Sequence, residues 1–215
     1  PTGVGKSTLL SHLIRQDIEA GHGVVVVDPK GDLVDDTVTR LSADALKRVV
    51  VLDPSDRAPV GVNPLASAQR GASGVAVDGL LGVLHSLWAS SWGPRLHDVL
   101  HAGLLTLALD DQKLGHSLVE LPVLLTNPTF RRPLVARASA HDPLGLGSFW
   151  AWFDSLSDEQ TAQVLGPVMN KLRAFILRPD LRAVLGQTQP RFSVGQVFTE
   201  RRSLLVRLPK GELGG

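Results

Sequence analysis

The chain has 215 residues, of which 43% are hydrophobic and 20% are charged, and its formal net charge is +1 at pH 7. The absence of cysteine excludes a disulfide scaffold and thiolate metal sites. No apolar run approaches the roughly 18 residues that span a membrane. Aromatic residues make up only 5% of the chain, with no tyrosine, which argues against an extended base-stacking platform.

The first seven residues, PTGVGKS, match all but the first position of the phosphate-binding pattern G-x-x-x-x-G-K-[ST]. The leading glycine of that pattern would stand one place before Pro1, and the only methionine is Met169. We therefore expect the chain to be an internal segment of a longer protein. The candidate nucleotide-binding residues are Gly3, Val4, Gly5, Lys6, Ser7 and Thr8.

Each residue type in this loop has a physical role. Small residues let backbone N–H groups turn inward around phosphate, and the following helix adds its positive N-terminal end. Lys6 would neutralise the β- and γ-phosphates, and the Ser7 hydroxyl would join the Mg²⁺ shell. Thr8 would face the α-phosphate or cap the helix. The pattern therefore predicts a nucleoside triphosphate with Mg²⁺ as the ligand.

Helices and strands alternate after the loop. Residues 5–20 show helical periodicity, and a helix is expected over residues 32–47 with an interruption near Ser42. Residues 24–27 and 49–52 are short β-branched runs, typical of strands buried on both faces, and Asp-Pro follows each. The alternation predicts an α/β fold with a parallel sheet.

From about residue 71 the pattern becomes helical. Helices are expected over residues 75–88, 94–109 and, after the capping box Ser157-Asp158-Glu159-Gln160, up to about Leu177. Residues 203–208 return as a strand. We expect residues 1–70 to form the N-terminal part of a nucleotide-binding core, residues 71–186 an inserted all-helical domain, and residues 187–215 the return to the core.

Hydrolysis of ATP also requires an acid at a strand end to order Mg²⁺. Asp28 and Asp53 both stand at such ends, but Pro follows each where a water-orienting Glu would be expected. A strand-ending Asp-Pro turn is the favoured interpretation of both.

Two other motifs suggest different chemistry. Asp28-Pro29-Lys30-Gly31 fits the D-x-x-G of a GTPase, but the best match to N-K-x-D is Asn170-Lys171-Leu172-Arg173, which ends in Arg within an expected helix. His97 and His101 share a helix face at metal-ligand spacing. Asp98 replaces the usual Glu and no third ligand is evident, so the favoured interpretation is two histidines on an exposed helix face. The remaining histidines show no constellation of catalytic or metal-binding partners. The four tryptophans are expected to be packing residues.

Basic residues are concentrated near the end, where residues 171–215 hold nine basic and three acidic side chains. Such a stretch indicates either a polyanion-binding face or a solvated helical surface. The nine are Lys171, Arg173, Arg178, Arg182, Arg191, Arg201, Arg202, Arg207 and Lys210.

The segments GVVVVDPKGDLVDD, VVVLDPSD, VGVNPL, WGPRLHDVL and SLLVRLPKGELG resemble conjugative coupling ATPases of the TraG/TraD type. These belong to the wider HerA/FtsK-like group of P-loop DNA pumps. The resemblance runs over nearly the whole chain and implies a RecA-like core that carries an inserted all-helical domain. By motif, it assigns nucleotide binding to Gly3, Gly5, Lys6, Ser7 and Thr8.

The resemblance also implies a function. Members form hexameric rings on the cytoplasmic face of the membrane and use ATP to drive DNA, expected to be single-stranded, or a protein–DNA complex toward a secretion channel. Relaxase-type and channel proteins are the implied partners. The family's Walker B acids, its transmembrane helices and its trans-acting arginine have no counterpart in this sequence, so negligible hydrolysis is expected from residues 1–215 alone.

Two further hypotheses remain open. A P-loop kinase would transfer phosphate to an acceptor without stimulation by DNA. A non-catalytic, nucleotide-gated interaction module would assemble on nucleotide binding without turnover.

Overall fold

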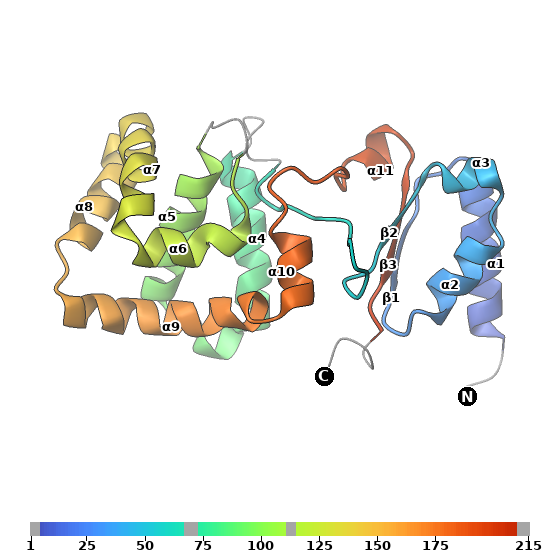
Figure 1. Cartoon of the computed structure of the whole chain (residues 1–215), viewed down its shortest axis with the longest axis horizontal. Coiled ribbons are helices and arrows are strands. Elements are labelled where there is room, and N and C mark those ends of the chain that lie inside the picture. The colour runs from blue at the N-terminus through green and yellow to red at the C-terminus, as the bar shows by residue number, and fades with distance from the viewer. Residues whose placement is uncertain (1–4, 67–72, 111–114, 210–215) are drawn as a thin grey trace. The chain divides into compact units, whose positions relative to one another are not determined.

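The computed structural model describes residues 5–66, 73–110 and 115–209. The chain divides into two compact units, one made of Pro1–Val62 with Pro190–Gly215 and the other of Asn63–Gln189. The first is an α/β unit and the second, within the described residues, contains only helices (Figure 1). The expected insert, residues 71–186, falls inside this helical unit.

The α/β unit is built on a three-stranded parallel sheet in the order β1-β3-β2. Parallel pairing places Val26 opposite Leu205 of β3, and Leu205 opposite Val51 of β2. The expected α/β class with a parallel sheet is therefore confirmed. The elements are α1 (Lys6–Glu19), β1 (Val25–Asp28), α2 (Asp32–Thr39), α3 (Ala43–Leu46), β2 (Val49–Leu52), α11 (Gln196–Thr199) and β3 (Ser203–Arg207).

The helices α1 and α2 pack on one face of this sheet, where Ile18, Val26, Val34 and Leu205 form part of a buried cluster. The other face of β1 differs from the expectation. Val25 is 48% exposed and Val27 is 59% exposed. The prediction that this strand is buried on both faces is wrong, because within the α/β unit the helices α1 and α2 cover only the Val26 face.

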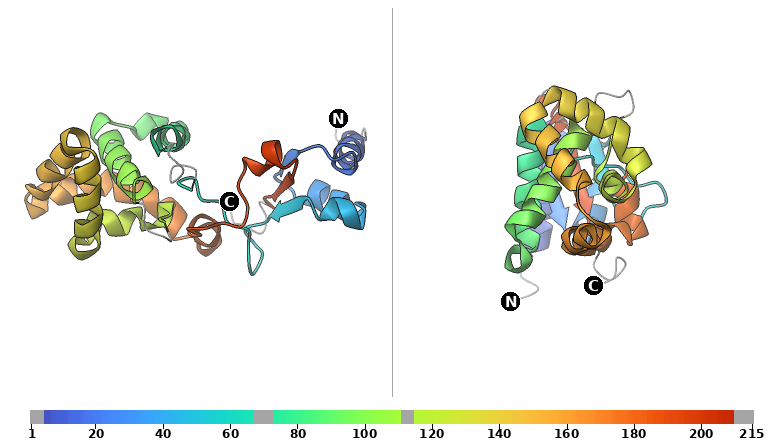
Figure 2. Two further views of the ribbon diagram at one scale, coloured as in Figure 1. Left: turned by 90° about the horizontal axis from the view of Figure 1, so that it is seen from above. Right: turned by 90° about the vertical axis from the view of Figure 1, so that its left-hand side faces the viewer.

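The helical unit is organised around α5, whose side chains point into a core on several sides. The helices α4, α6, α7 and α9 all contact α5 (Figure 2). Within the core, Trp150 Nε1 donates to Thr106 Oγ1 at 2.9 Å, and both residues are 1% exposed. The elements are α4 (Ser73–Leu87), η2 (Ala89–Ser91), α5 (Pro94–Ala108), η3 (Leu118–Glu120), α6 (Leu121–Thr126), α7 (Pro128–His141), η4 (Pro143–Gly147), α8 (Ser148–Asp154), α9 (Asp158–Ile176) and α10 (Pro179–Leu185).

One side chain joins the beginning and the end of the helical unit. Asn63 Nδ2 donates to the carbonyl oxygens of His116 and Thr188, both at 2.9 Å. Asn63 is buried, and its Oδ1 accepts the N–H of Leu65 at 3.0 Å. The amide therefore holds together the two points at which the chain enters and leaves this unit.

Candidate functional site

The start of α1 has the backbone features of an anion-binding helix terminus. Gly5 precedes the helix with φ +73°, a left-handed conformation that glycine adopts without strain. The N–H of Leu9 donates to the Gly5 carbonyl at 2.9 Å, so the first turn forms directly after this glycine. Among the described residues, no acidic side chain lies in that turn and no side chain caps it. Within the described residues, no side chain therefore competes with a ligand for the N–H groups of this turn.

The loop residues expected to bind nucleotide are only partly described. The expectations for Gly3 and Val4, and for the side chain of Lys6, lie outside what the structure describes. Ser7 and Thr8 are exposed in the first turn of α1 and line a pocket of about 470 Å³ between α1 and α2. The structure thus places the two hydroxyl-bearing residues of the motif on one pocket.

The wall of this pocket includes residues that sequence reasoning did not identify. Ser11 Oγ donates to Asp36 Oδ2 at 2.6 Å, and Arg40 Nε donates to Asp36 Oδ1 at 2.7 Å. The Ser11 hydroxyl, and after it Arg40, hold the pKa of the Asp36 carboxyl below its usual value. The four-residue spacing of Ser7, Ser11 and Arg15 on one face of α1 was the available signal.

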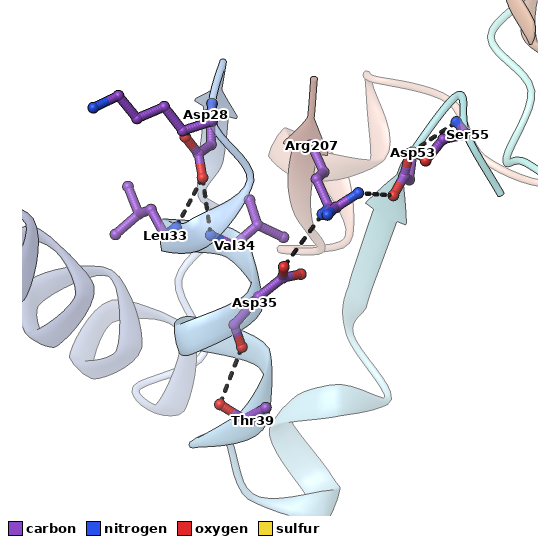
Figure 3. A network of polar contacts seen from close by, with 9 residues as sticks. Asp28, Leu33, Val34, Asp35, Thr39, Asp53, Ser55 and Arg207 are labelled. Carbon is purple, nitrogen blue, oxygen red and sulfur yellow. Dashed lines mark hydrogen bonds and ion pairs between the residues drawn. The ribbon is translucent and has the colours of Figure 1, made fainter. Parts of the chain in front are cut away.

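Asp28 also lines the pocket, but its carboxylate is occupied by backbone (Figure 3). It accepts the N–H of Lys30 at 3.0 Å, of Leu33 at 2.8 Å and of Val34 at 3.3 Å. Burial raises the pKa of this 6%-exposed group, but the surrounding N–H donors outweigh burial and lower it. Asp28 therefore anchors the start of α2, which agrees with the favoured interpretation of a structural strand-end turn.

Asp53 is likewise engaged in structural contacts. Its Oδ1 accepts the Ser55 N–H at 2.9 Å and the Ser55 hydroxyl at 2.6 Å, and its Oδ2 accepts Arg207 Nη1 at 2.8 Å. Burial opposes ionisation, but Ser55 and then Arg207 lower the pKa of the Asp53 carboxyl. Both candidate metal-ordering acids thus have structural partners.

Arg207 lies between two acids rather than projecting from the surface. Its Nε donates to Asp35 Oδ2 of α2 at 3.3 Å, and its side chain is 19% exposed (Figure 3). A Cβ on Gly31, which has φ +93°, would lie 2.9 Å from this Nε. The Asp28–Asp32 turn therefore favours glycine for its conformation, and a Cβ there would also force the Arg207 side chain to shift.

The alternative motifs take other positions. Asn170 and Lys171 lie inside α9 and not in a loop at the sheet edge, where guanine would be recognised. The rings of His97 and His101 are 5.9 Å apart, and His101 lies 3.9 Å from Asp78. Within residues 5–66, 73–110 and 115–209, no group of three His, Cys, Asp or Glu side chains is arranged to hold a metal ion.

The expectation that the remaining histidines show no constellation is wrong for His116. Its Nε2 lies 2.7 Å from Asp110 Oδ2 and its Nδ1 lies 3.0 Å from Glu120 Oε1, while Arg137 Nε donates to Asp110 Oδ1 at 2.7 Å. Glu120 and then Asp110 raise the pKa of His116 above its usual value despite burial. The spacing H-S-x-x-E, which combines an i,i+4 pair with a capping box, was the missed signal.

The basic end of the sequence does not form one continuous segment of structure. Lys171, Arg173, Arg178 and Arg182 belong to the helical unit, whereas Arg191 and the basic residues after it belong to the α/β unit. Arg207 is paired with acids, and Lys210 lies outside the described residues. The tryptophans are packing residues, as expected: Trp150 is buried, and Trp88, Trp92 and Trp152 pack partly buried against the same core.

A scan against protein-family models and searches of curated proteins and of solved structures each find no match. In the part of the chain that the structure describes, no helix combines the length and the apolar character needed to cross a bilayer.

Proposed function

We propose that the α/β unit binds ATP with Mg²⁺ at the loop leading into α1, through the six residues of the motif, with the Ser7 hydroxyl in the Mg²⁺ shell. The observation that carries the proposal is the left-handed Gly5 at the uncapped start of α1, beside the pocket lined by Ser7 and Thr8. Among the described residues, no atom lies within 4 Å of the position that a Cβ on Gly5 would take, which is compatible with a phosphate group at this helix end.

The position of the site relative to the sheet supports the same proposal. The helix α1 begins near the carboxyl end of β1, because Ser7 and Asp28 line one pocket. Ligands of open parallel α/β sheets bind beyond the carboxyl ends of their strands. A nucleotide at Gly5 would lie at this carboxyl edge of the sheet.

We further propose that the unit is a RecA-like core and that the intact protein is an ATP-driven DNA translocase, a coupling ATPase for conjugation or type IV secretion. The support is the resemblance of the segments quoted above, together with a helical unit that separates β2 from β3. In this proposal the intact protein forms a hexamer on the cytoplasmic face of the membrane. It receives single-stranded DNA from relaxase-type partners and delivers it to a secretion channel.

The test is the ATPase rate of the intact protein with and without single-stranded DNA. We expect DNA to stimulate ATP turnover by the parent protein. We expect Lys6→Ala to abolish ATP turnover. Lys47→Ala is the matched control, because Lys47 is an exposed lysine of the same unit that pairs only with the exposed Asp44 in the described structure. Full turnover by Lys6→Ala would contradict the proposal. Turnover that ignores DNA would favour a kinase or a protein-moving ATPase.

One observation favours a second candidate for the chain by itself, a nucleotide-gated interaction module. Asp28 and Asp53 are both engaged by structural donors, so neither described strand-end acid is free to order a metal. Residues 1–215 would then bind nucleotide with negligible hydrolysis. Robust hydrolysis by these residues, abolished by Asp28→Ala, would overturn this assignment.

A further inference from the structure

Three carboxylates line the pocket beside Ser7, and they differ in what they bind. Asp28 accepts three backbone N–H groups, and Asp36 accepts the Ser11 hydroxyl and Arg40. Asp32 is exposed at the first position of α2, and within the described residues it makes no hydrogen bond or ion pair. It is therefore the one carboxylate of this pocket whose oxygens the described protein leaves available.

Arg15, Lys30 and Arg40 also line the pocket and suit phosphate, whereas the available oxygen atoms on its two sides suit a divalent cation. The hydroxyl of Ser7 comes from the first turn of α1, and the carboxylate of Asp32 comes from the first turn of α2. Mg²⁺ takes oxygen ligands, retains several waters, and is usually held by one or two carboxylates together with substrate phosphates. A single carboxylate and a hydroxyl match this pattern.

The same inventory indicates when the metal would bind. No cluster of three acidic or histidine side chains suited to a metal lies within the described ranges. One carboxylate and one hydroxyl are too few ligands to hold Mg²⁺ alone. The phosphates of a nucleotide at Gly5 would have to complete the set, so the metal is expected to bind only together with ATP.

We infer that Asp32 is the protein's carboxylate partner for nucleotide-bound Mg²⁺, acting with Ser7 across the pocket between α1 and α2. This inference rests on the proposed nucleotide site. Asp32 begins α2 and is not a strand-end acid, so the inference concerns retention of Mg²⁺ with bound nucleotide and not hydrolysis. Asp32 holds the ion directly or through one of its waters, and it makes no contact with the nucleotide itself.

The test separates metal binding from nucleotide binding in the intact protein. The dissociation constant of a fluorescent ATP analogue is measured in EDTA and across a Mg²⁺ titration. We expect Mg²⁺ to tighten binding to the parent protein. The Mg²⁺ requirement is the Mg²⁺ concentration that gives half of this tightening. In Asp32→Asn we expect it to rise about 10- to 100-fold, as for other groups that position a metal. The dissociation constant in EDTA should be unchanged.

The matched control is Asp35→Asn. It removes the same charge from the same first turn of α2, but Asp35 faces Arg207 and does not line the pocket. Its Mg²⁺ requirement should equal that of the parent. Binding of Mn²⁺ in the presence of the analogue, followed by electron paramagnetic resonance, gives a readout of the ion itself. It should weaken only in Asp32→Asn.

The outcomes distinguish this inference from the proposed function. An unchanged Mg²⁺ requirement in Asp32→Asn, or an equal loss of affinity in EDTA and in Mg²⁺, would overturn the role of Asp32 while leaving the nucleotide site intact. Absence of analogue binding to the parent protein, or full binding by Lys6→Ala, would overturn the proposed function and the inference with it. Thermal unfolding followed by circular dichroism verifies that the variants are folded.

Discussion

Arg207 Nη1 donates to Asp53 Oδ2 at 2.8 Å, although 154 positions separate the two residues in sequence. Asp53 directly follows β2 and Arg207 ends β3, so the pair joins the strand that precedes the helical unit to the strand that follows it. Asp35 of α2 binds the same guanidinium. One arginine thus connects two strands and a helix at the carboxyl edge of the sheet.

Removing this arginine should destabilise the α/β unit. Arg207→Ala leaves the 16%-exposed Asp53 side chain without its cation, and we expect the free energy of unfolding to fall by about 1–3 kcal/mol. All four tryptophans lie in the helical unit. The loss should therefore appear in urea unfolding followed by far-ultraviolet circular dichroism, with little change in the tryptophan fluorescence transition.

The exposed Arg201 supplies the control for this experiment. Arg201→Gly removes a guanidinium from the same segment and also relieves the positive φ of 52° at that position, so it should not destabilise the unit. Equal stability of the Arg207→Ala protein and the parent would show that the Arg207–Asp53 pair contributes nothing.

The stability of the helical unit should depend on pH through His116. Glu120 and Asp110 raise the pKa of His116 above its ordinary value of 6.5, so its contribution is fully present below pH 6.5. That contribution is lost as the pH rises through the raised pKa. Glu120 behaves in the opposite sense. Burial opposes ionisation, but His116 and Ser117 lower its pKa from 4.5, and its contribution is lost as the pH falls through the lowered value.

The measurement is urea unfolding at a series of pH values from 5 to 9, followed by tryptophan fluorescence. For the parent, we expect the urea concentration at the unfolding midpoint to decrease as the pH rises. We expect His116→Gln to be less stable than the parent at pH 6 and to show no such decrease at alkaline pH. His12→Gln, on an exposed position of α1, is the control. The same alkaline decline in His116→Gln and in the parent would refute the assignment to His116.

Asp28 should matter for folding more than for metal binding. Asp28→Ala removes the acceptor for the first N–H groups of α2, a change that resembles the loss of an N-cap and costs about 1–2 kcal/mol. Asp28→Ala protein that is folded should still bind nucleotide more tightly when Mg²⁺ is added. Unchanged stability together with a lost Mg²⁺ response would identify Asp28 as the metal-ordering acid instead.

The buried bond between Trp150 and Thr106 offers a test of the helical core. Thr106→Val keeps the volume but leaves the indole N–H without an acceptor, and should cost about 1–3 kcal/mol. Trp150→Phe removes the donor as well as part of the ring. The double variant should therefore be less destabilised than the sum of the two single variants, and strict additivity of the two free-energy changes would contradict the importance of the bond.

Part of this fold follows from local sequence signals. The capping box at Ser157 and Gln160 predicted the start of α9, and both of its hydrogen bonds form. Ser42 was expected to interrupt a helix, and it caps α3. The strand over residues 49–52 was predicted with the bounds of β2. These features were predictable because helix caps, periodicity and β-branched runs act between residues only a few positions apart.

The periodicity after the motif likewise predicted a helix from about residue 5, and α1 begins at Lys6. Gly5 adopts the left-handed conformation expected of a phosphate loop, and Ser7 and Thr8 lie together on the pocket beside it. The availability of Asp32 was not predictable from the motif. It depends on which donors occupy Asp28 and Asp36, and one of those donors, Ser11, is 25 positions away from Asp36.

Only the tertiary structure decided the longer-range relationships. The insertion of β3 between β1 and β2, the burial of one face of β1, the acids around Arg207 and the carboxylates around His116 all depend on which elements pack together. Asn63 and Thr188 are 125 positions apart, yet a single amide joins them. The sequence by itself determined most of the helices and strands, because those depend on neighbouring residues. The pairing of distant acids and bases was settled only when apolar burial had brought their strands and helices together.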